Sequence, residues 1–225
     1  MIPIDHSKKF SDFFEKKTEP RKVGFLVLHH IEANSVEHAI RQLCEHQVSS
    51  HFLIDELGKI FELVAENDVA WHAGVSHWRG VEGLNQTSIG IEFINSSPFT
   101  KKFEMVQMQS GLSLCQYLIR KYQIKPGDVV GHSDIAYDKE TGLPDRKQDP
   151  SHLFDWKFLA MSGVGIFPDF SLTILRDFRR GDCDPKIAEV KKNLRDFGYR
   201  VMNMNDEFDL ELSALATVFS RRFGQ

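Results

Sequence analysis

The stretch from Val23 to His30, VGFLVLHH, decides the fold of this chain. It is a β-rich apolar run that fits a strand buried inside a sheet. Successive side chains of an extended segment point to opposite faces, so Val27 and His29 face one way, and Leu28 and His30 face the other. Because a rigid strand can direct the side chain at its end into a cleft, His29 is a candidate for a functional site.

The segments that follow alternate between extended and helical patterns. SHFLID and KIFELV predict two strands joined by a turn that contains Gly58. Apolar side chains at three- and four-residue spacing predict a long core-facing helix over residues 101–123. A helix over VEHAIRQLCEHQ, strands at TSIGIEFIN and VVGH, and a helix at LFDWKFLA complete the pattern. Strands that alternate with helices indicate an α/β domain up to about residue 166.

The pattern changes toward the end of the chain. Apolar side chains recur at helical spacing from Ile187 to Phe197 and again from Leu212 to Phe223, which predicts a small helical module. We therefore expect four segments: an N-terminal extension (1–20), an α/β domain (21–166), a linker (167–182) and the helical module (183–225).

Composition limits the class of protein. Of the 225 residues, 41% are apolar and 27% are charged, which is ordinary for a soluble globular protein. The formal charge of −4 gives no reason to expect a nucleic-acid partner, which needs a basic face. Three cysteines without a CxxC pair predict neither a disulfide framework nor a thiolate metal site. The chain as written has no signal peptide and no transmembrane segment, although removal of an export signal would leave the same sequence.

Histidines are numerous, ten in all, and most histidines lie at the surface or form hydrogen bonds in the core. His29 and His132 differ because each ends an apolar, strand-like run. Asp149 precedes a proline, which restricts the direction of its carboxylate. Two imidazoles and a carboxylate leave the fourth position of a tetrahedral zinc ion open, as a catalytic site needs. Spacing alone does not distinguish this set from other triplets in the chain, so both interpretations stay open at this point.

Ordered motifs between about residues 20 and 160 add context: VLHH, VSSHFLID, AWHAGVSHWRG, LNQTSIGIEFIN, VVGHSDIA and RKQDP. They resemble the zinc-dependent N-acetylmuramoyl-L-alanine amidases of the amidase-2 group, which includes the peptidoglycan recognition proteins. The resemblance implies a mixed central β-sheet flanked by helices. It also implies hydrolysis of the amide bond between N-acetylmuramic acid, or its anhydro form, and L-alanine. VKKNLRDFGYRV and the final FSRRFGQ resemble the small three-helix peptidoglycan-binding domains. The alternative is a helical extension that only stabilises the first domain.

The resemblance also implies roles for individual residues. His29, His132 and Asp149 match the zinc ligands of the family. Glu92, at the end of SIGIE, matches the general base, and Lys147 of RKQD matches the lysine that stabilises the developing oxyanion. These roles agree with the chemistry, because a carboxylate can take the proton of the attacking water and a cation stabilises negative charge in the transition state. For an isolated Glu or Lys, an ion pair at the rim or a solvated side chain is the simpler explanation.

Five further residues are expected to bind the substrate. In AWHAGVSHWRG, His72 is expected near the scissile bond, and Arg79 is expected to pair with a stem-peptide carboxylate. A hydrogen bond to backbone is an equal alternative for His72. Trp71 is a candidate wall of the cleft, although packing is favoured for it. Asn34 and Asn85 are weaker candidates.

The segment from Tyr137 to Pro144 departs from the family pattern. In these amidases the second histidine and the aspartate are usually closer together, whereas DKETGLP intervenes here, and Ser151 replaces a common glycine. Asp145 therefore competes with Asp149 as the third ligand. Asp149 is preferred because a proline follows it and because it comes two residues after Lys147. The insertion is either a solvated loop or a contact to the glycan.

Two classes of function remain. The first is a Zn²⁺-dependent amidase that acts on peptidoglycan or muropeptides, and the second is a non-catalytic muropeptide-binding protein of the same fold. The complete set of His29, His132, Asp149 and Glu92 favours the enzyme. No protein partner is indicated. The wall-binding-like module favours the periplasm or cell envelope, whereas the missing signal favours the cytoplasm.

Overall fold

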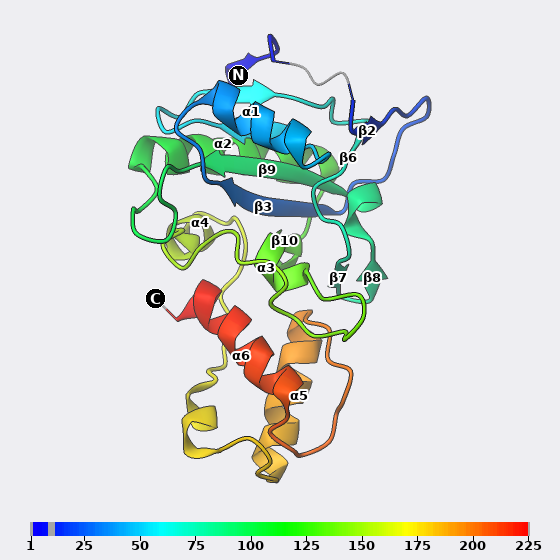
Figure 1. Cartoon of the computed structure of the whole chain (residues 1–225), viewed down its shortest axis with the longest axis vertical. Helices are drawn as coiled ribbons and strands as arrows, with labels where there is room; N and C mark the ends of the chain where they lie inside the picture. Colours follow the sequence, from blue (N-terminus) through cyan, green and yellow to red (C-terminus); the bar gives the residue numbers. More distant parts are fainter. Residues whose placement is uncertain (1, 9–11, 225) are drawn as a thin grey trace.

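The centre of the protein is a six-stranded sheet with the strand order β1-β5-β4-β9-β3-β10, in a computed structural model that describes residues 2–8 and 12–224 (Figure 1). The two longest strands, β3 (Phe25–Ile31) and β9 (Ser88–Ile94), are parallel neighbours. β10 (Val129–Gly131) and β4 (Phe52–Ile54) extend the parallel part on either side. β5 (Ile60–Glu62) runs antiparallel to β4, and β1 (Ile4–Asp5) is parallel to β5. The predicted α/β fold with a mixed central sheet is confirmed.

Helices cover both faces of this sheet. On one face, α2 (Met105–Tyr122) and α4 (Trp156–Met161) form an apolar core with Leu28 of β3. On the opposite face, the side chains of α1 (Val36–Glu45) pack against Leu53 of β4. The alternation predicted for β3 holds, so the face opposite α2 is the face that carries His29.

Local sequence explains the ends of these helices. The hydroxyl of Ser35 accepts the N–H of His38 at 3.1 Å and caps the start of α1. α2 ends where Gln123 adopts a left-handed backbone with φ 55°. The β4–β5 turn uses Gly58 with φ +80°, as its position in the predicted hairpin requires.

Short elements complete the fold. The strand pairs are β2 (Phe14–Glu15) with β6 (Val69–Ala70) and β7 (His77–Trp78) with β8 (Val81–Glu82). The remaining short helices are η1 (Leu84–Thr87), η2 (Pro126–Asp128), α3 (His132–Ile135) and η3 (Thr173–Asp177).

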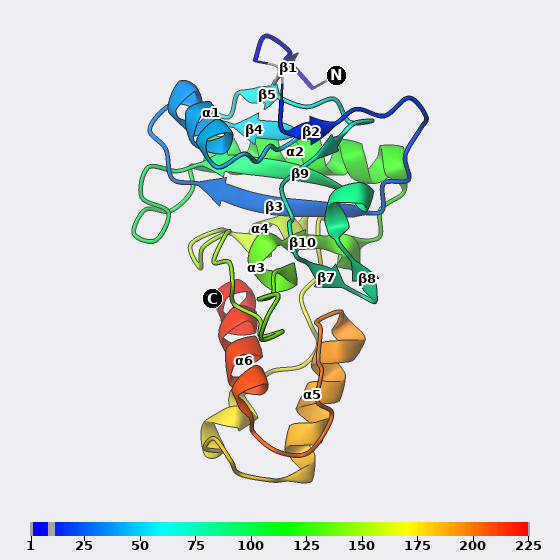
Figure 2. The same cartoon turned by 45° about the vertical axis from the view of Figure 1, so that its right-hand side comes forward.

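The C-terminal part projects from the edge of the sheet next to β10 (Figures 1 and 2). Across residues 183–224 the structure has two α-helices, α5 (Pro185–Phe197) and α6 (Leu210–Phe223). The 3-10 helix η3 precedes them, inside the predicted linker, so a third α-helix is not found in this module. Parts of the expected segments that fall on residues 1, 9–11 and 225 lie outside the described residues. Within 2–8 and 12–224, no helix combines the length and apolarity needed to cross a membrane.

The C-terminal helices share a hydrophobic core with the α/β part. One buried cluster joins Val27 of β3 and Trp78 of β7 to Leu194 of α5 and Leu215 of α6. The Trp78 ring lies 5.0 Å from the ring of Tyr199. The residues that follow the predicted linker are therefore packed onto the sheet domain itself.

Candidate active site

Three parallel strands bring the predicted site residues to one edge of the sheet. His29 lies near the end of β3 and is the register partner of Glu92 on β9. His132 is the first residue of α3, directly after β10. Because β3, β9 and β10 run in the same direction, their carboxyl ends meet at the same edge, where α/β proteins commonly bind ligands.

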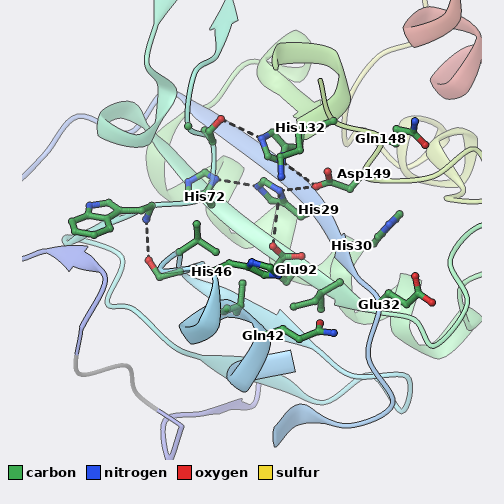
Figure 3. Close-up of a pocket in the computed structure, with 18 of the residues that line it drawn as sticks. His29, His30, Glu32, Gln42, His46, His72, Glu92, His132, Gln148 and Asp149 are labelled. Carbon is green, nitrogen blue, oxygen red and sulfur yellow. Dashed lines mark hydrogen bonds and ion pairs between the residues drawn. The ribbon is translucent and has the colours of Figure 1, made fainter. Parts of the chain in front are cut away.

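Two histidines converge on one carboxylate at this edge. Asp149 Oδ2 lies 3.0 Å from His29 Nδ1 and 3.1 Å from His132 Nδ1 (Figure 3). One donor atom from each of the three residues lies within 4.8 Å of the other two, so the group could hold a metal ion. His29 is 2% exposed and His132 is 6% exposed, so both imidazoles are shielded from water.

The electrostatics of this cluster suit metal binding. Burial lowers the pKa of the His29 imidazole to about 4, so the ring is neutral at neutral pH. Burial alone would raise the pKa of Asp149, but the contacts with His132 and His29 outweigh it and lower that pKa well below its usual range. A neutral imidazole and an ionised carboxylate are the protonation states in which these side chains ligate metals.

Glu92 lies beside the cluster with an oxygen that has no hydrogen-bond partner. Its Oε1 is 4.0 Å from His29 Nδ1, while the buried Oε2 has none among the described residues. Burial, followed by the negative charge of Asp149, raises the pKa of Glu92 well above its usual range. Lys147 lines the same pocket, and its positive charge opposes this rise. A buried carboxyl with a raised pKa has the properties of a general acid–base group.

His72 is buried and contacts His29, one of the candidate metal ligands. His29 Nε2 is 3.1 Å from His72 Nδ1, and His72 Nε2 is 3.1 Å from the hydroxyl of Ser88. That hydroxyl donates to the carbonyl of Leu84 at 2.6 Å. Nδ1 of His29 faces the cluster, so its Nε2 is free to donate to Nδ1 of His72. His72 Nε2 can then donate to the hydroxyl of Ser88. The structure therefore places His72 in the lining of the same pocket as His29, with side chains as its partners instead of the backbone considered from the sequence.

The cluster lies in a pocket of about 670 Å³. Trp71, which is 42% exposed, and Asn85 line this pocket. The Asn85 side chain also accepts the N–H groups of His72 and Ala73 at 3.1 and 2.7 Å, so it fixes the backbone of AWHAG. Further lining residues that the sequence did not single out are Glu32, Gln42, His46, Phe99 and Arg146.

Two expected substrate contacts lie outside this pocket. Arg79 Nε donates to the carbonyl of Phe197 at 3.0 Å, and its Nη1 lies 3.4 Å from Asp128. Arg79 thus fastens η2 and α5, and the structure does not bring it into the pocket of the His–His–Asp cluster. Asn34 lines a neighbouring hollow, where its Oδ1 lies 3.2 Å from His38 Nδ1.

The insertion between the two ligand candidates is anchored to the protein. Tyr137 and Pro144 form an isolated bridge across its base. Asp145, the competitor for the third ligand position, accepts from Arg221 at 2.7 Å. Asp149, by contrast, meets both histidines, and its carbonyl accepts the N–H of Ser133 at 2.7 Å. Geometry therefore favours Asp149 over Asp145.

Together, the fold and the site define an α/β protein with a buried His–His–Asp cluster that could hold a metal ion in a cleft. Residues 19–152 match the model of the family described as N-acetylmuramoyl-L-alanine amidase. The chain therefore belongs to this amidase family.

Two similar proteins match most of the chain. N-acetylmuramoyl-L-alanine amidase AmiD of Escherichia coli (strain K12) is 40% identical, across 91% of this chain and 84% of AmiD. The 1,6-anhydro-N-acetylmuramyl-L-alanine amidase AmpD of Haemophilus influenzae is 32% identical, across 65% of this chain and 86% of AmpD.

Solved structures of the same family are also similar. One is E. coli AmiD in complex with the substrate anhydro-N-acetylmuramic acid-L-Ala-D-gamma-Glu-L-Lys. It has a TM-score of 0.66 and 31% identity, and the match covers 94% of this chain and 93% of AmiD. Another is AmpDh3 of Pseudomonas aeruginosa in complex with anhydromuramic pentapeptide. It has a TM-score of 0.69 and 29% identity, and the match covers 100% of this chain and 90% of AmpDh3.

Proposed function

We propose that this protein is a zinc-dependent amidase. It hydrolyses the amide bond between N-acetylmuramic acid, or its anhydro form, and L-alanine in peptidoglycan or muropeptides. The observation that carries the proposal is the convergence of His29, His132 and Asp149 beside Glu92, which has an unpartnered buried oxygen. The substrates bound in the AmiD and AmpDh3 complexes support the same substrate class.

The donor set fits zinc. Two imidazole nitrogens and one carboxylate oxygen are a ligand combination found in catalytic zinc sites, which keep a fourth position for water or substrate. Glu92 lines the same pocket, and a water bound there could satisfy its unpartnered Oε2. Zn²⁺ supplies a Lewis acid that polarises the scissile carbonyl and increases the acidity of water. His29, His132 and Asp149 would hold it.

Each remaining residue then has a separate task. Glu92 takes the proton of the attacking water and returns it to the departing amine of L-alanine. The ammonium group of Lys147 stabilises the negative charge that develops on the carbonyl oxygen in the transition state. His72 fixes the ring of His29, because hydrogen bonds to the second imidazole nitrogen orient a ligating histidine. Trp71 and Asn85 contribute the wall of the substrate pocket.

The location of the protein is a further part of this proposal. Peptidoglycan lies in the cell envelope, so we place the action of the protein in the periplasm or envelope. Fractionation of cells, followed by detection of the protein with an antibody, tests this placement. A protein found entirely in the cytoplasmic fraction would contradict it and would favour soluble muropeptides as substrates.

The test of the function uses the purified chain with anhydro-N-acetylmuramyl tripeptide. We expect about one zinc per chain by elemental analysis and release of free tripeptide measured by chromatography. Treatment with a chelator should abolish turnover, and added Zn²⁺ should restore it. A chain that binds the muropeptide without releasing peptide in the presence of zinc would instead be a muropeptide-binding protein, the alternative function of this fold.

A further inference from the structure

The element that carries His132 is fastened to the C-terminal helices by a buried network. Asp134, in the same short helix, accepts the backbone N–H of Gly131 at 2.7 Å, directly before His132. The same carboxylate accepts from Arg222 of α6 at 2.6 Å and from the hydroxyl of Tyr199 at 2.8 Å. The side chains of Asp134 and Arg222 are 0% and 3% exposed, so this ion pair is shielded from solvent.

Arg222 of α6 also contacts β10 and α4. Its Nη2 donates to the carbonyl of Val129 in β10 at 3.0 Å, and its guanidinium lies 4.2 Å from the ring centroid of Trp156. Both overall views place α6 next to α3, in agreement with the contacts between them (Figures 1 and 2). Loss of the cation would leave a carboxylate buried and unpaired, which is much more costly than losing an exposed pair.

The chain just before Asp149 also contacts the C-terminal part of the protein. Arg221 of α6 donates to Asp145 at 2.7 Å, four residues before Asp149. Arg200 donates to the carbonyl of Gly142 at 2.9 Å, and its guanidinium lies 4.5 Å from the ring centroid of Tyr137. Tyr137 and Gly142 of the insertion therefore contact Arg200, and Asp145, directly after the insertion, contacts Arg221.

The helix of His132 is too short to hold its own orientation. α3 has four residues, so few of its backbone groups can pair within the helix. Metal ligands need support from surrounding residues, because small displacements weaken the site. The His132 ring itself contacts the carbonyl of Ala73, which lies 3.2 Å from Nε2. The backbone before His132 is supported by Asp134, which in turn is held by Arg222 and Tyr199.

We propose that the C-terminal helices position the metal ligands of this site, with Asp134, Arg222 and Tyr199 acting as positioning residues for His132. The inference rests on the proposed zinc amidase function, and it gives α5 and α6 a role that does not require them to bind the cell wall. At the Asp149 end, Arg221 of α6 holds Asp145, four residues before that ligand.

The test measures zinc affinity of the full chain by competition with a chromophoric chelator. Tyr199→Phe removes one hydroxyl and keeps the ring packing, whereas Arg222→Met removes the cation and keeps most of the side-chain volume. We expect the zinc Kd to rise about 10-fold in Tyr199→Phe and up to about 100-fold in Arg222→Met. Substitution of Co²⁺ should give an altered visible absorption spectrum in both variants, because that spectrum depends on ligand geometry.

The matched control is Lys191→Met. Lys191 is buried and pairs with Asp209 at 2.6 Å within the C-terminal module, away from the metal ligands. This variant should lose stability yet keep the zinc Kd and the Co²⁺ spectrum of the wild type.

Three outcomes decide the inference. Weaker zinc binding in Tyr199→Phe with an unchanged Lys191→Met supports it. A wild-type zinc Kd in folded Tyr199→Phe or Arg222→Met overturns it, and so does an equal loss of affinity in Lys191→Met. A wild-type protein that binds zinc but releases no peptide would count against the proposed function alone, because the affinity comparison does not depend on turnover.

Discussion

A substitution of Glu92 can distinguish loss of catalysis from loss of metal binding. It lies beside the His–His–Asp cluster, and its Oε2 has no partner among the described side chains. We predict that Glu92→Gln keeps the zinc content of the wild type and lowers turnover by about 10²- to 10⁴-fold, because the proton acceptor is lost. Elemental analysis and chromatographic detection of released peptide measure the two properties separately.

His132→Ala is the comparison variant for this prediction. It removes a ligand candidate, so zinc and activity should disappear together. If Glu92→Gln also lost its zinc, the carboxylate would be part of the metal site and the proposed division of roles would be wrong.

His51 predicts a pH dependence of stability. Burial, reinforced by the positive charge of Arg21, lowers the pKa of His51 to about 3. The ring accepts the N–H of Gly90 at 3.0 Å and lies 3.1 Å from the carbonyl of Asp68. The native imidazole thus stays neutral, while the unfolded chain takes up a proton below its ordinary pKa of about 6.5. The contribution of His51 to stability is complete above that pH and is lost as the pH falls toward 3.

The measurement is urea unfolding of the zinc-free protein at several pH values. One such histidine changes the free energy of unfolding by about 1.4 kcal/mol per pH unit in this window. We expect His51→Gln to reduce the slope between about pH 6 and pH 4 by that amount. An identical slope in the variant would show that His51 binds its proton equally well in the folded state.

The metal-ligand candidates could be predicted from the sequence, whereas the residues that support them could not. His29 and His132 follow apolar runs that define strands, so their place at a sheet edge follows from local pattern. Arg79 has its partner at Phe197, 118 positions along the chain, and no local pattern contains such a contact. His72 meets His29 across 43 positions for the same reason.

At the scale of elements, β9 must approach the AWHAG segment closely. A Cβ built on Gly90 would lie 2.5 Å from the ring of His72, so a glycine is required at this point of the strand. We predict that Gly90→Ala displaces His72 from His29 and raises the zinc Kd by about 10-fold or more. Chelator competition measures the affinity.

Gly24→Ala is the matched control, because a Cβ on Gly24 meets no atom within 4 Å. It should bind zinc as the wild type does. Equal affinities in the two variants would mean that the contact between His72 and His29 does not support the metal site.

The apolar periodicity of the sequence predicts the long helices and strands, but it does not predict the short ones. The helix expected over residues 101–123 is α2, and the expected strand at TSIGIEFIN is β9. The four-residue helix α3 carries no periodic signal, because one helical turn cannot repeat an apolar spacing. The C-terminal module was expected to hold three helices, but the segment before α5 forms the 3-10 helix η3 instead of an α-helix.

The whole molecule has a core that crosses the boundary expected at residues 167–182. Val27 and Trp78 of the α/β part are buried in the same cluster as Leu194 and Leu215 of the C-terminal helices. The buried pair of Asp134 with Arg222 crosses the same boundary. Elements that share a core and a buried ion pair lose their burial together, so separation of the two parts would expose apolar surface on both.

We therefore predict a single cooperative unfolding transition by calorimetry, with equal calorimetric and van't Hoff enthalpies. Added zinc should raise the Tm of the whole transition, because a ligand that binds the native state stabilises it. Lys191→Met, which alters only the C-terminal module, should cost about 1–3 kcal/mol. At about 2–4 °C per kcal/mol for a chain of this size, it should lower the Tm of that same transition. Two resolved transitions, of which only the one unaffected by zinc responds to Lys191→Met, would show that the C-terminal helices unfold independently of the metal site.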